Sequence, residues 1–327
     1  MNTKQMVLQV LENRKGEHIS GEELARTLGV SRNAVWKAIN SLRSEGYKLE
    51  AVPNKGYCLL EENDIISQQS VQKHLKNTDF FRLTVMDRVD STNAVLKRLA
   101  ESGEAEGRVV IANEQTFGKG RMGRSFYSPP GSGIYISLLL RPKLSAANSL
   151  LITTAAAVAV CRAIEDVSGR KAAIKWVNDI YCGGKKVCGI LTEASMDFES
   201  GMLSYAVLGI GINIARPEGG FPRELEEIAT SIYEDMPCSS EVRSRLAANV
   251  LDGFLEIYRN LPSKSFMGEY RQRSFVIGKE IYIISPNYRE EALVIDIDDD
   301  ARLIVKTAAG EIKTLSSGEI SIREKRT

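Results

Sequence analysis

The stretch Gly118-Lys-Gly-Arg-Met-Gly-Arg124 places three cations and three glycines in seven consecutive positions. Glycine allows positive φ angles and close approach to a ligand, at a cost in conformational entropy that a plain surface loop has no reason to bear. Apolar runs flank the stretch at residues 108–113 and 133–140. The pattern predicts a mobile cationic loop between two strands, able to close over an anion.

Two common phosphate-binding motifs do not fit this loop. A Walker A loop needs Ser or Thr directly after Gly-Lys at the mouth of a helix. A dinucleotide fingerprint needs its third glycine at the opening of a helix, which the sequence does not offer here. The alternative interpretation is a flexible basic surface turn, because short motifs of this kind also arise by chance.

Length and composition indicate an ordinary soluble protein of two or three domains. The chain has 327 residues, of which 43% are hydrophobic and 26% are charged. Its longest apolar stretch, residues 150–160, is shorter than the roughly 18 residues that a membrane span needs. The N-terminus lacks a signal-peptide pattern. We therefore expect a cytoplasmic protein without a membrane partner.

The reactive side chains exclude several kinds of site. Five cysteines include no C-x-x-C pair, and only two histidines, His18 and His74, are present. This set favours reduced thiols over disulfides and argues against a metal centre or a His-based nucleophile. A net charge of +1 provides little long-range steering toward nucleic acid. Any DNA binding must come from a local surface.

The first 64 residues follow the pattern of a winged helix-turn-helix domain. Ser20-Gly-Glu-Glu23 is a capping box that opens a second helix, and Gly29 supplies the turn that follows. Ser31 caps a third helix, whose apolar residues recur at helical spacing. Two short β-like runs, at 47–52 and 56–60, predict the hairpin that forms the wing.

The outer side of the third helix carries side chains that can donate to phosphates and base edges. They predict the DNA-binding surface: Arg32, Asn33, Trp36, Lys37 and Asn40. The alternative is a small three-helix bundle that binds protein, because this geometry is reused for other purposes.

Residues 65–275 mix strands and helices and predict a central sheet packed by helices. We expect strands at 82–86, 109–113, 134–140, 172–176, 186–193 and 203–214, and helices at 92–101, 148–167 and 241–260. Residues 276–327 are β-rich, and their five short strands suggest a small barrel. We interpret its cluster of aspartates, Asp296 and Asp298 to Asp300, as a solvated hairpin tip because calcium-loop spacing is absent.

Polar groups of the middle domain stand where a ligand can use them. Asp90-Ser-Thr-Asn93 lies at a helix start, where free N–H groups and side-chain amides suit an uncharged polar ring, although such a segment is often only a cap. Lys175-Trp-Val-Asn-Asp179 places an amide and a carboxylate at a strand end, and Lys185-Lys186 follows a Gly-Gly turn. Strand ends are common places for binding sites.

Five motifs stand in the order and approximate spacing of those of the biotin protein ligases. They are Asp90-Ser-Thr-Asn93, Gln115 with residues 118–124, Lys175-Trp-Val-Asn-Asp179, Lys186-Val-Cys-Gly-Ile-Leu-Thr-Glu193 and Gly209-Ile-Gly-Ile-Asn213. Any one of them is weak, but five in order are specific. With its two flanking domains, the whole chain resembles the bifunctional type that also represses the biotin operon.

The resemblance implies an α+β multidomain fold. Residues 1–64 would be the winged helix-turn-helix domain, and residues 65–275 a mixed α/β sheet domain of the class II synthetase-like biotin ligase type. Residues 276–327 would be a small SH3-like β-barrel. The reaction would consume ATP with Mg²⁺, form biotinyl-5'-AMP, and transfer biotin to a lysine of a biotin carboxyl carrier protein of acetyl-CoA or pyruvate carboxylase. Operator DNA and a ligand-promoted homodimer complete the implied partners.

The resemblance also assigns roles to residues of this sequence. The catalytic residues would be Arg121, Lys186 and Asp179. Biotin would be bound by Ser91, Thr92, Asn93, Gln115, Lys119, Gly120, Arg121 and Lys186. The nucleotide would be bound by Lys119, Arg121, Asn178, Asn213 and Arg323. Residues 215–221 look like a second loop that orders on the adenylate.

Three positions depart from the family pattern. Val177 replaces the usual proline between Trp and Asn, and Lys119 stands where the loop often has arginine, so a planar bidentate donor is lost. Met122 also replaces what can be a further arginine, and methionine offers no charged donor to a phosphate there. Two other functions stay open: a transcription factor that senses a small acid without chemistry, and a ligase that takes lipoate or octanoate in place of biotin.

Overall fold

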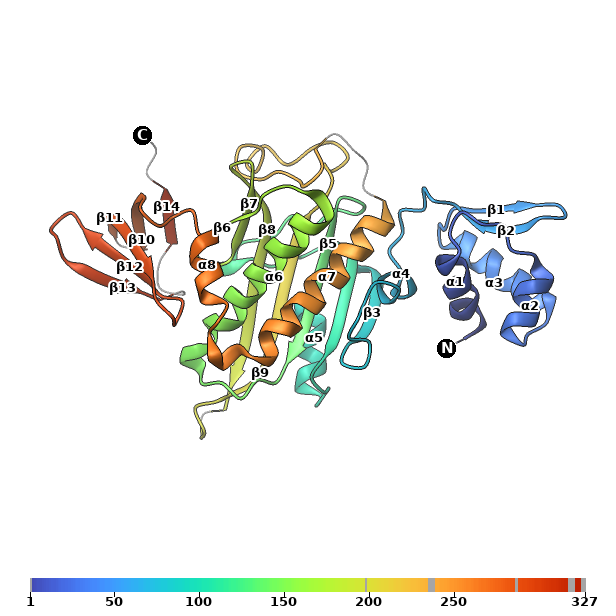
Figure 1. The fold of residues 1–327 in the computed structure, drawn as a ribbon, viewed down its shortest axis with the longest axis horizontal. Coiled ribbons are helices and arrows are strands. Elements are labelled where there is room, and N and C mark those ends of the chain that lie inside the picture. The colour runs from blue at the N-terminus through green and yellow to red at the C-terminus, as the bar shows by residue number, and fades with distance from the viewer. Residues whose placement is uncertain (1, 198, 235–238, 286–287, 317–320, 325–327) are drawn as a thin grey trace.

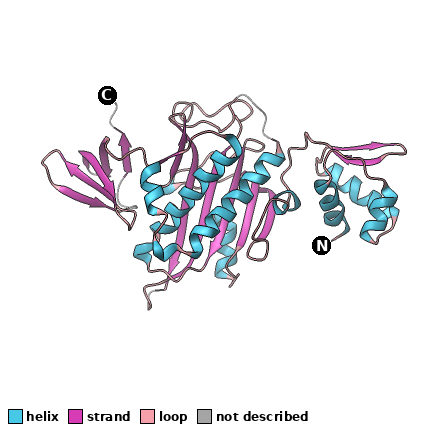
Figure 2. Cartoon of the chain, in the orientation of Figure 1, coloured by secondary structure: helices cyan, strands magenta, loops and turns pink. Residues whose placement is uncertain are grey.

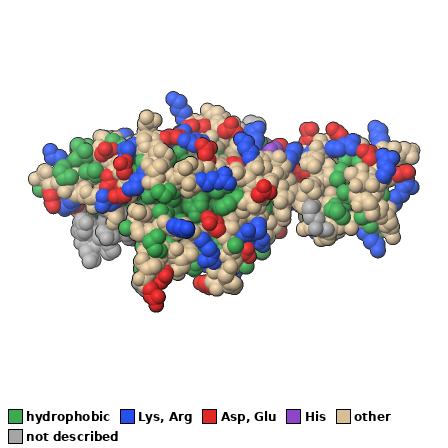
Figure 3. All heavy atoms as spheres, turned by 60° about the horizontal axis from the view of Figure 1, so that its bottom comes forward, with side chains coloured by type: hydrophobic (Ala, Val, Ile, Leu, Met, Phe, Trp, Pro, Cys, Tyr) green, Lys and Arg blue, Asp and Glu red, His purple; other side chains and the backbone are tan. Residues whose placement is uncertain are grey.

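The computed structural model describes residues 2–197, 199–234, 239–285, 288–316 and 321–324. Three parts follow one another along the long axis of the molecule, from the helical N-terminal part through a large central domain to a small β domain at the C-terminus (Figure 1). This order confirms the predicted three-part architecture. Figure 3 shows basic and acidic side chains interspersed over one face, in keeping with the near-zero net charge.

The N-terminal part is a helix-turn-helix with a two-stranded wing. Its elements are α1 (Thr3–Asn13), α2 (Gly21–Leu28), α3 (Arg32–Ser44), β1 (Leu49–Val52) and β2 (Gly56–Leu59). Helices α2 and α3 are both capped, since Ser20 Oγ accepts from Glu23 N and Ser31 Oγ accepts from Ala34 N. The predicted capping box at Ser20 is incomplete, because the Glu23 carboxylate accepts from Arg14 Nη1. Gly29 ends α2 with φ +65°, a left-handed conformation that favours glycine. A separate apolar core holds the three helices together.

The central domain is built on a seven-stranded sheet with the order β3-β4-β5-β9-β8-β7-β6. Only β3 and β4 are parallel, and every other neighbouring pair is antiparallel. The strands are β3 (Arg82–Val89), β4 (Arg108–Gln115), β5 (Gly133–Leu140), β6 (Ala173–Lys175), β7 (Asp179–Cys182), β8 (Lys185–Met196) and β9 (Leu203–Asn213). Figure 2 shows helices lying against this sheet.

Alternating side chains of the strands face two different apolar clusters. Val109 and Ile111 join the large core under α6 (Leu150–Ser168) and α7 (Ser240–Arg259), whereas Val110 joins the smaller cluster under α5 (Thr92–Glu101). This is the period of two that a strand imposes. Helices α6 and α7 therefore cover one face of the sheet, and α5 covers part of the other face.

Helix α6 belongs to this core. Residues 146–168 are long and apolar enough to cross a membrane, but 72% of the most apolar window is buried inside the protein. It packs against α7, where Gly253 lets the backbones approach Ala159. The small side chains of the Ala-rich stretch thus serve helix packing.

Three elements of the central domain were not predicted from the sequence. The short helices α4 (Gln68–Gln72) and α8 (Met267–Arg273) have too few residues to show a helical period. The expected strand 172–176 is also wrong at its end, because β6 stops at Lys175 and Asp179 opens a separate strand, β7. Residues 176–178 are therefore the turn of a β-hairpin.

The C-terminal domain is a five-stranded antiparallel sheet with the order β13-β12-β11-β10-β14. Its strands are β10 (Glu280–Ser285), β11 (Tyr288–Ile297), β12 (Leu303–Thr307), β13 (Ile312–Leu315) and β14 (Ser321–Glu324). The sequence predicted a solvated tip for the aspartates of the β11–β12 hairpin. The structure differs, because Asp299 pairs with Arg271 and Asp300 pairs with Lys264. The tip is thereby fastened to the central domain.

Candidate functional site

A cavity of about 1230 Å³ opens at the end of the central sheet where the glycine-rich loop lies. Every predicted site residue of the central domain lines it: Ser91, Thr92, Asn93, Gln115, Lys119, Gly120, Arg121, Asn178, Asp179, Lys186 and Asn213. These residues span more than a hundred positions of sequence. Their convergence is the main structural evidence for one binding site.

One wall of the cavity is a network of uncharged polar groups. Gln115 Oε1 accepts from Thr92 N at 2.9 Å and from Thr92 Oγ1 at 3.0 Å, and Gln115 Nε2 donates to Ser128 Oγ at 3.0 Å. Ser137 Oγ, which is fully buried on β5, lies 2.7 Å from Thr92 Oγ1. The start of α5 and the end of β4 are thus locked together in a pattern that suits a neutral polar ring.

The side-chain amide of Asn93 already forms hydrogen bonds within the protein. Its Nδ2 donates to Glu193 Oε2 at 2.9 Å, and its Oδ1 accepts from Ser137 Oγ at 2.6 Å. A side chain at Gly209 would overlap Asn93, because a Cβ there would lie 2.2 Å from Oδ1. Asn93 therefore lines the site and also fixes its wall.

Glu193 joins this network to positive charge. Burial raises the pKa of Glu193, but hydrogen bonds from Asn93 and Lys97 and the charges of Lys97 and Lys119 lower it more, so the carboxyl is ionised at neutral pH. Lys97 Nζ lies 3.1 Å from Glu193 Oε1. The anion behind Asn93 holds the amide in one orientation.

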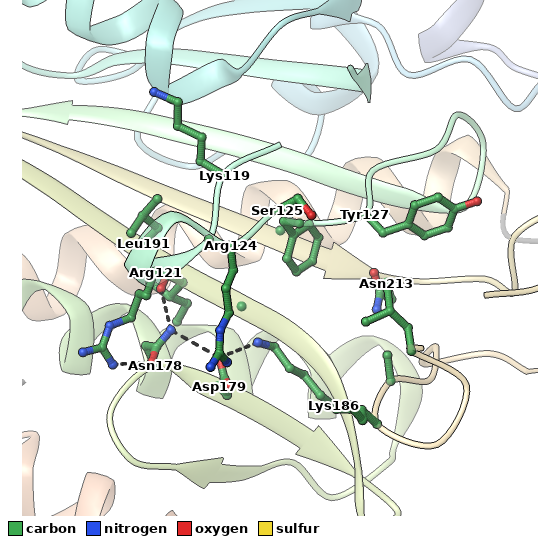
Figure 4. A pocket seen from close by; sticks show the side chains of 18 of the residues that line it. Lys119, Arg121, Arg124, Ser125, Tyr127, Asn178, Asp179, Lys186, Leu191 and Asn213 are labelled. Atoms are coloured by element: carbon green, nitrogen blue, oxygen red, sulfur yellow. Dashed lines mark hydrogen bonds and ion pairs between the residues drawn. The ribbon is translucent and has the colours of Figure 1, made fainter. Parts of the chain in front are cut away.

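The opposite wall is a chain of polar contacts between charged groups. Lys186 Nζ lies 2.7 Å from Asp179 Oδ1, and Asn178 Nδ2 lies 3.2 Å from the same oxygen. Arg121 Nη1 donates to Asn178 Oδ1 at 3.0 Å. Figure 4 shows the four side chains converging from the loop, the β6–β7 turn and β8. The two cations flank one carboxylate.

Arg121 is partly buried in this wall of the cavity. Burial lowers the pKa of Arg121, and the nearby Asp179 carboxylate partly opposes that change. A guanidinium stays protonated under such conditions, so the site keeps a desolvated positive charge. Such a charge attracts an anion more strongly than an exposed one would.

The β6–β7 turn, which carries Asn178 and leads into Asp179, is held by two hydrogen bonds from buried side chains. Tyr270 of α8, which is fully buried, donates its hydroxyl to Val177 O at 3.0 Å. Trp176 Nε1 donates to Ala301 O of the C-terminal domain at 2.8 Å. The C-terminal domain therefore supports the turn next to the charged chain.

The glycine-rich loop is folded back on itself. Gly120 N donates to Arg124 O at 2.7 Å, and residues 121–123 form a single 3₁₀ turn. A Cβ at Gly118 would lie 2.4 Å from Phe126 O, so this position requires glycine. Lys119 points away from Arg121, Asn178, Asp179 and Lys186 (Figure 4), although it lines the cavity.

Two predicted nucleotide residues, Asn213 and Arg323, come from different domains. Asn213 ends β9, and its Nδ2 donates to Thr230 O at 3.2 Å. Nearby, Tyr127 and Phe221 pack edge to face with ring centroids 6.4 Å apart, and both line the cavity. Arg323 lies on β14, but its side chain is outside the part of the chain that the structure describes.

Sequence reasoning missed some of the lining residues. The ring of Phe126 covers β9, because a Cβ at Gly211 would lie 2.5 Å from it. The repeated glycines of residues 209–213 were a signal for such a close approach, but they do not say which ring fills the space. Arg124 was noted only for its charge, and Tyr282 and Arg289 of the C-terminal domain carried no recognisable motif.

The predicted DNA-binding residues lie together on α3. Arg32, Asn33, Trp36 and Lys37 are exposed, and Trp36 keeps 54% of its surface accessible. Asn40 is partly buried on the same helix. Arg32 forms an ion pair with Glu22 of α2, so its guanidinium already has a partner. In the described part of the chain, no cluster of three His, Cys, Asp or Glu residues offers a preformed metal site.

Comparisons with known proteins assign families to all three parts. Residues 85–213 match the biotin/lipoate A/B protein ligase family, residues 3–58 match an HTH domain, and residues 276–323 match the biotin protein ligase C terminal domain. Among solved structures, the biotin protein ligase from Aquifex aeolicus in complex with biotin and ATP is 27% identical. It covers 75% of this chain and 99% of its own, with a TM-score of 0.61.

Two curated relatives match along nearly the whole length. The bifunctional ligase/repressor BirA of Bacillus spizizenii is 36% identical over 327 residues, covering 97% of each chain. The BirA of Escherichia coli is 29% identical over 315 residues, covering 94% of each chain. The three family matches and the full-length similarity agree with the geometry of the cavity, and the chain belongs to the biotin protein ligase family, in its bifunctional ligase/repressor branch.

Proposed function

We propose that this protein is an ATP-dependent biotin protein ligase, which forms biotinyl-5'-AMP and transfers biotin to a lysine of an acceptor protein. The observation that carries the proposal is the meeting of a neutral polar wall, around Thr92 and Gln115, with a cationic wall, around Arg121 and Lys186, in one cavity. A ureido ring suits the first wall, and a carboxylate next to a phosphate suits the second.

The first step joins two anions. An oxygen of biotin's carboxylate attacks the α-phosphorus of ATP, the bond from that phosphorus to the β-phosphate oxygen breaks, and pyrophosphate leaves with the electron pair. Lys186 and Arg121 offset the charge that grows as the phosphoryl oxygens crowd together. Lys119 and Gly120 of the loop close over the carboxylate and the phosphate. Loop closure also keeps water from the reactive mixed anhydride.

Biotin's ring is placed by the wall at the start of α5. Ser91 and Thr92 offer hydroxyls, Gln115 offers its amide, and Asn93 contributes while it is held by Glu193. Lys186 bridges the carboxylate of biotin and the adenylate oxygens. The nucleotide lies toward Asn178 and Asn213, and Arg323 of β14 is the further nucleotide residue of this proposal.

Mg²⁺ enters with the nucleotide in this proposal. The cavity offers two carboxylates, Asp179 and Glu227, which fits an ion held by one or two carboxylates together with substrate phosphates. The bound ion would neutralise phosphate charge during displacement. No all-protein cage is needed for that role.

The second step transfers biotin to the acceptor. The amine of a lysine attacks the acyl carbon of the mixed anhydride, and AMP leaves as the amide forms. Asp179 orients this amine or takes its proton, because its carboxylate lies beside the cations of the first step. We propose the biotin carboxyl carrier protein of acetyl-CoA or pyruvate carboxylase as the acceptor.

The N-terminal domain makes the same protein a biotin-responsive repressor. We propose that residues 1–64 bind operator DNA through Arg32, Asn33, Trp36, Lys37 and Asn40, that residues 65–275 carry catalysis, and that residues 276–327 complete the site. The adenylate orders the loops, and the ordered loops favour a homodimer that spans paired half-sites. The edge strand β3 leaves unpaired backbone groups for sheet-to-sheet contact. The expected location is the cytoplasm.

A label-transfer assay tests the ligase function. The purified protein is incubated with radiolabelled biotin, ATP and a carboxyl carrier domain, with lipoate in a parallel reaction. We expect ATP-dependent label on the acceptor lysine from biotin only. Label from lipoate would indicate the other acid, and no label from either acid would favour a sensor without chemistry.

A further inference from the structure

Two side chains of the C-terminal domain, Tyr282 on β10 and Arg289 on β11, line the cavity of the central domain. The guanidinium of Arg289 lies over the ring of Tyr282, 3.6 Å from its centre. Among the described residues, no carboxylate forms an ion pair with Arg289. A guanidinium stacked on a ring is held flat, while the N–H donors in its plane stay available.

The sheet connects this arginine to the reacting centre. Lys186 on β8 pairs with Tyr181 on β7, and Asp179 on β7 pairs with Lys175 on β6, and all four line the cavity. Asp179 also pairs with Gly189 of β8, and neighbouring strands lie about 4.8 Å apart, so Lys175 stands roughly 10 Å across the sheet from Gly189, three residues along β8 from Lys186. β6 is the last strand of the sheet.

The C-terminal domain stands beyond that edge. Figure 1 shows it on the side of β6 and α8, and Trp176, the residue after Lys175, donates to Ala301 O of this domain. The cavity floor therefore runs from Lys186 past Lys175 to the Tyr282 and Arg289 stack. Three cations, Lys186, Lys175 and Arg289, therefore line this path, and a chain of phosphates needs several such positive charges.

We propose that Arg289, supported by Tyr282, binds the β- and γ-phosphates of ATP and so forms part of the site for departing pyrophosphate. The proposal rests on the proposed ligase function. As the bond between the α-phosphorus and the bridging oxygen breaks, negative charge grows on the pyrophosphate. A fixed guanidinium at that place stabilises the charge, and its planar fork matches phosphate oxygens.

The test compares full-length variants in the two half-reactions. For Arg289→Ala we expect the KM for ATP to rise roughly ten- to hundredfold, the loss that removing one charge-assisted hydrogen bond produces. Inhibition by added pyrophosphate weakens in parallel. Biotin affinity, and transfer to the acceptor from purified biotinyl-5'-AMP, stay unchanged. Arg289→Lys, which keeps the charge but not the planar fork, retains part of the ATP affinity.

The matched control is Lys306→Ala, which removes an exposed cation of the same sheet that does not line the cavity. We expect it to leave the KM for ATP unchanged. An unchanged KM for ATP in Arg289→Ala overturns the proposal. A raised KM for the acceptor alone also overturns it and indicates a docking role.

Calorimetry separates this proposal from the proposed function. Binding of inorganic pyrophosphate to the unaltered protein, weakened by Arg289→Ala, supports the phosphate site even if no biotin is transferred. Equal pyrophosphate binding by the unaltered protein and Arg289→Ala refutes the site, whether or not the protein is a ligase.

Discussion

Lys186 Nζ lies 2.7 Å from Asp179 Oδ1, so the cation expected to meet biotin's carboxylate is held by an anion of the site itself. A quarter of each side chain is exposed, and a pair of this kind adds little to stability, about 1 kcal/mol or less. The contact keeps the amine pointed at the cavity until a ligand anion competes for it.

From this pair we predict the effect of Lys186→Ala. Adenylate formation falls by about 10² to 10³, the usual cost of removing one preorganised donor to developing charge, while the melting temperature changes little. Pyrophosphate release from biotin and ATP measures the rate. Lys185→Ala, one residue away with its amine on Glu226 O, is the control and should be nearly normal. Equal damage from both would contradict this role.

Arg121→Ala should weaken adenylate retention far more than folding. Arg121 loses its contact with Asn178 and its bond to the ligand, and a hydrogen bond to a charged group contributes roughly 1.5–3 kcal/mol. We expect biotinyl-5'-AMP to dissociate about ten- to hundredfold faster, as measured by stopped-flow fluorescence. A large drop in the melting temperature without ligand would show that Arg121 is mainly structural.

The buried Arg243 connects Asp64, in the segment before the central domain, to strands β4 and β5. It is 1% exposed, and its guanidinium donates to Asp64 O at 2.9 Å, to Gly133 O at 2.8 Å and to Asn113 Oδ1 at 3.1 Å. Arg243→Ala leaves these buried acceptors unsatisfied, and we expect a loss of roughly 2–5 kcal/mol in urea unfolding. Arg245→Ala, an exposed position on the same helix, should change stability by less than about 0.5 kcal/mol.

Lys37→Ala should impair DNA binding and leave ligation intact. Lys37 is exposed on α3, and losing one phosphate contact reduces the slope of log K against log salt by about 0.9. Titrations of operator DNA at several salt concentrations measure that slope. Lys171→Ala, an exposed lysine of the central domain, is the control. An unchanged slope in Lys37→Ala would remove this residue from the DNA surface.

The acid–base behaviour of Glu12 predicts a pH dependence of stability. Glu12 is 1% exposed, and burial raises its pKa above the usual 4.5, although Lys15 and a hydrogen bond from Ser67 lower it in part. The folded state therefore holds this proton more tightly than the unfolded state. The carboxyl's contribution is fully favourable below pH 4.5 and is lost as the pH rises through the folded pKa.

Glu12→Gln removes that titration. The fall in the free energy of unfolding above pH 4.5 should be smaller in the variant than in the unaltered protein, when urea unfolding is compared between pH 4 and 8. Identical pH profiles for the two proteins would rule out Glu12 as the source.

The sequence predicted most of the fold because its strong signals are local. Caps at Ser20 and Ser31 and the apolar periods of the long helices depend on neighbours in the chain. The turn at residues 176–178 was missed because β7 has only four residues. So short a strand shows too little alternation of apolar and polar residues to be recognised as separate from β6. The order of the strands also needs contacts between distant residues.

The site residues were predicted mainly from the resemblance of their motifs to those of the family, and less from local physical patterns in the sequence. Motif order placed Thr92, Gln115, Asn178 and Lys186 in one cavity, but no local pattern connects Arg289, more than a hundred residues from Lys186, to that cavity. The orientation of Lys119, away from the charged chain, also depends on packing around the loop. Residue types were predictable, whereas side-chain directions were not.

The central claim is that the glycine-rich loop holds Arg121 over the adenylate while Lys186 leaves Asp179 to bind it. A crystal structure with a non-hydrolysable biotinyl-5'-AMP analogue tests this most directly. We expect Arg121 and Lys186 within hydrogen-bond distance of the oxygens at the biotin–phosphate junction, with residues 118–124 closed over them. A ligand bound elsewhere in the cavity, with the loop apart from it and Lys186 still on Asp179, would contradict the account.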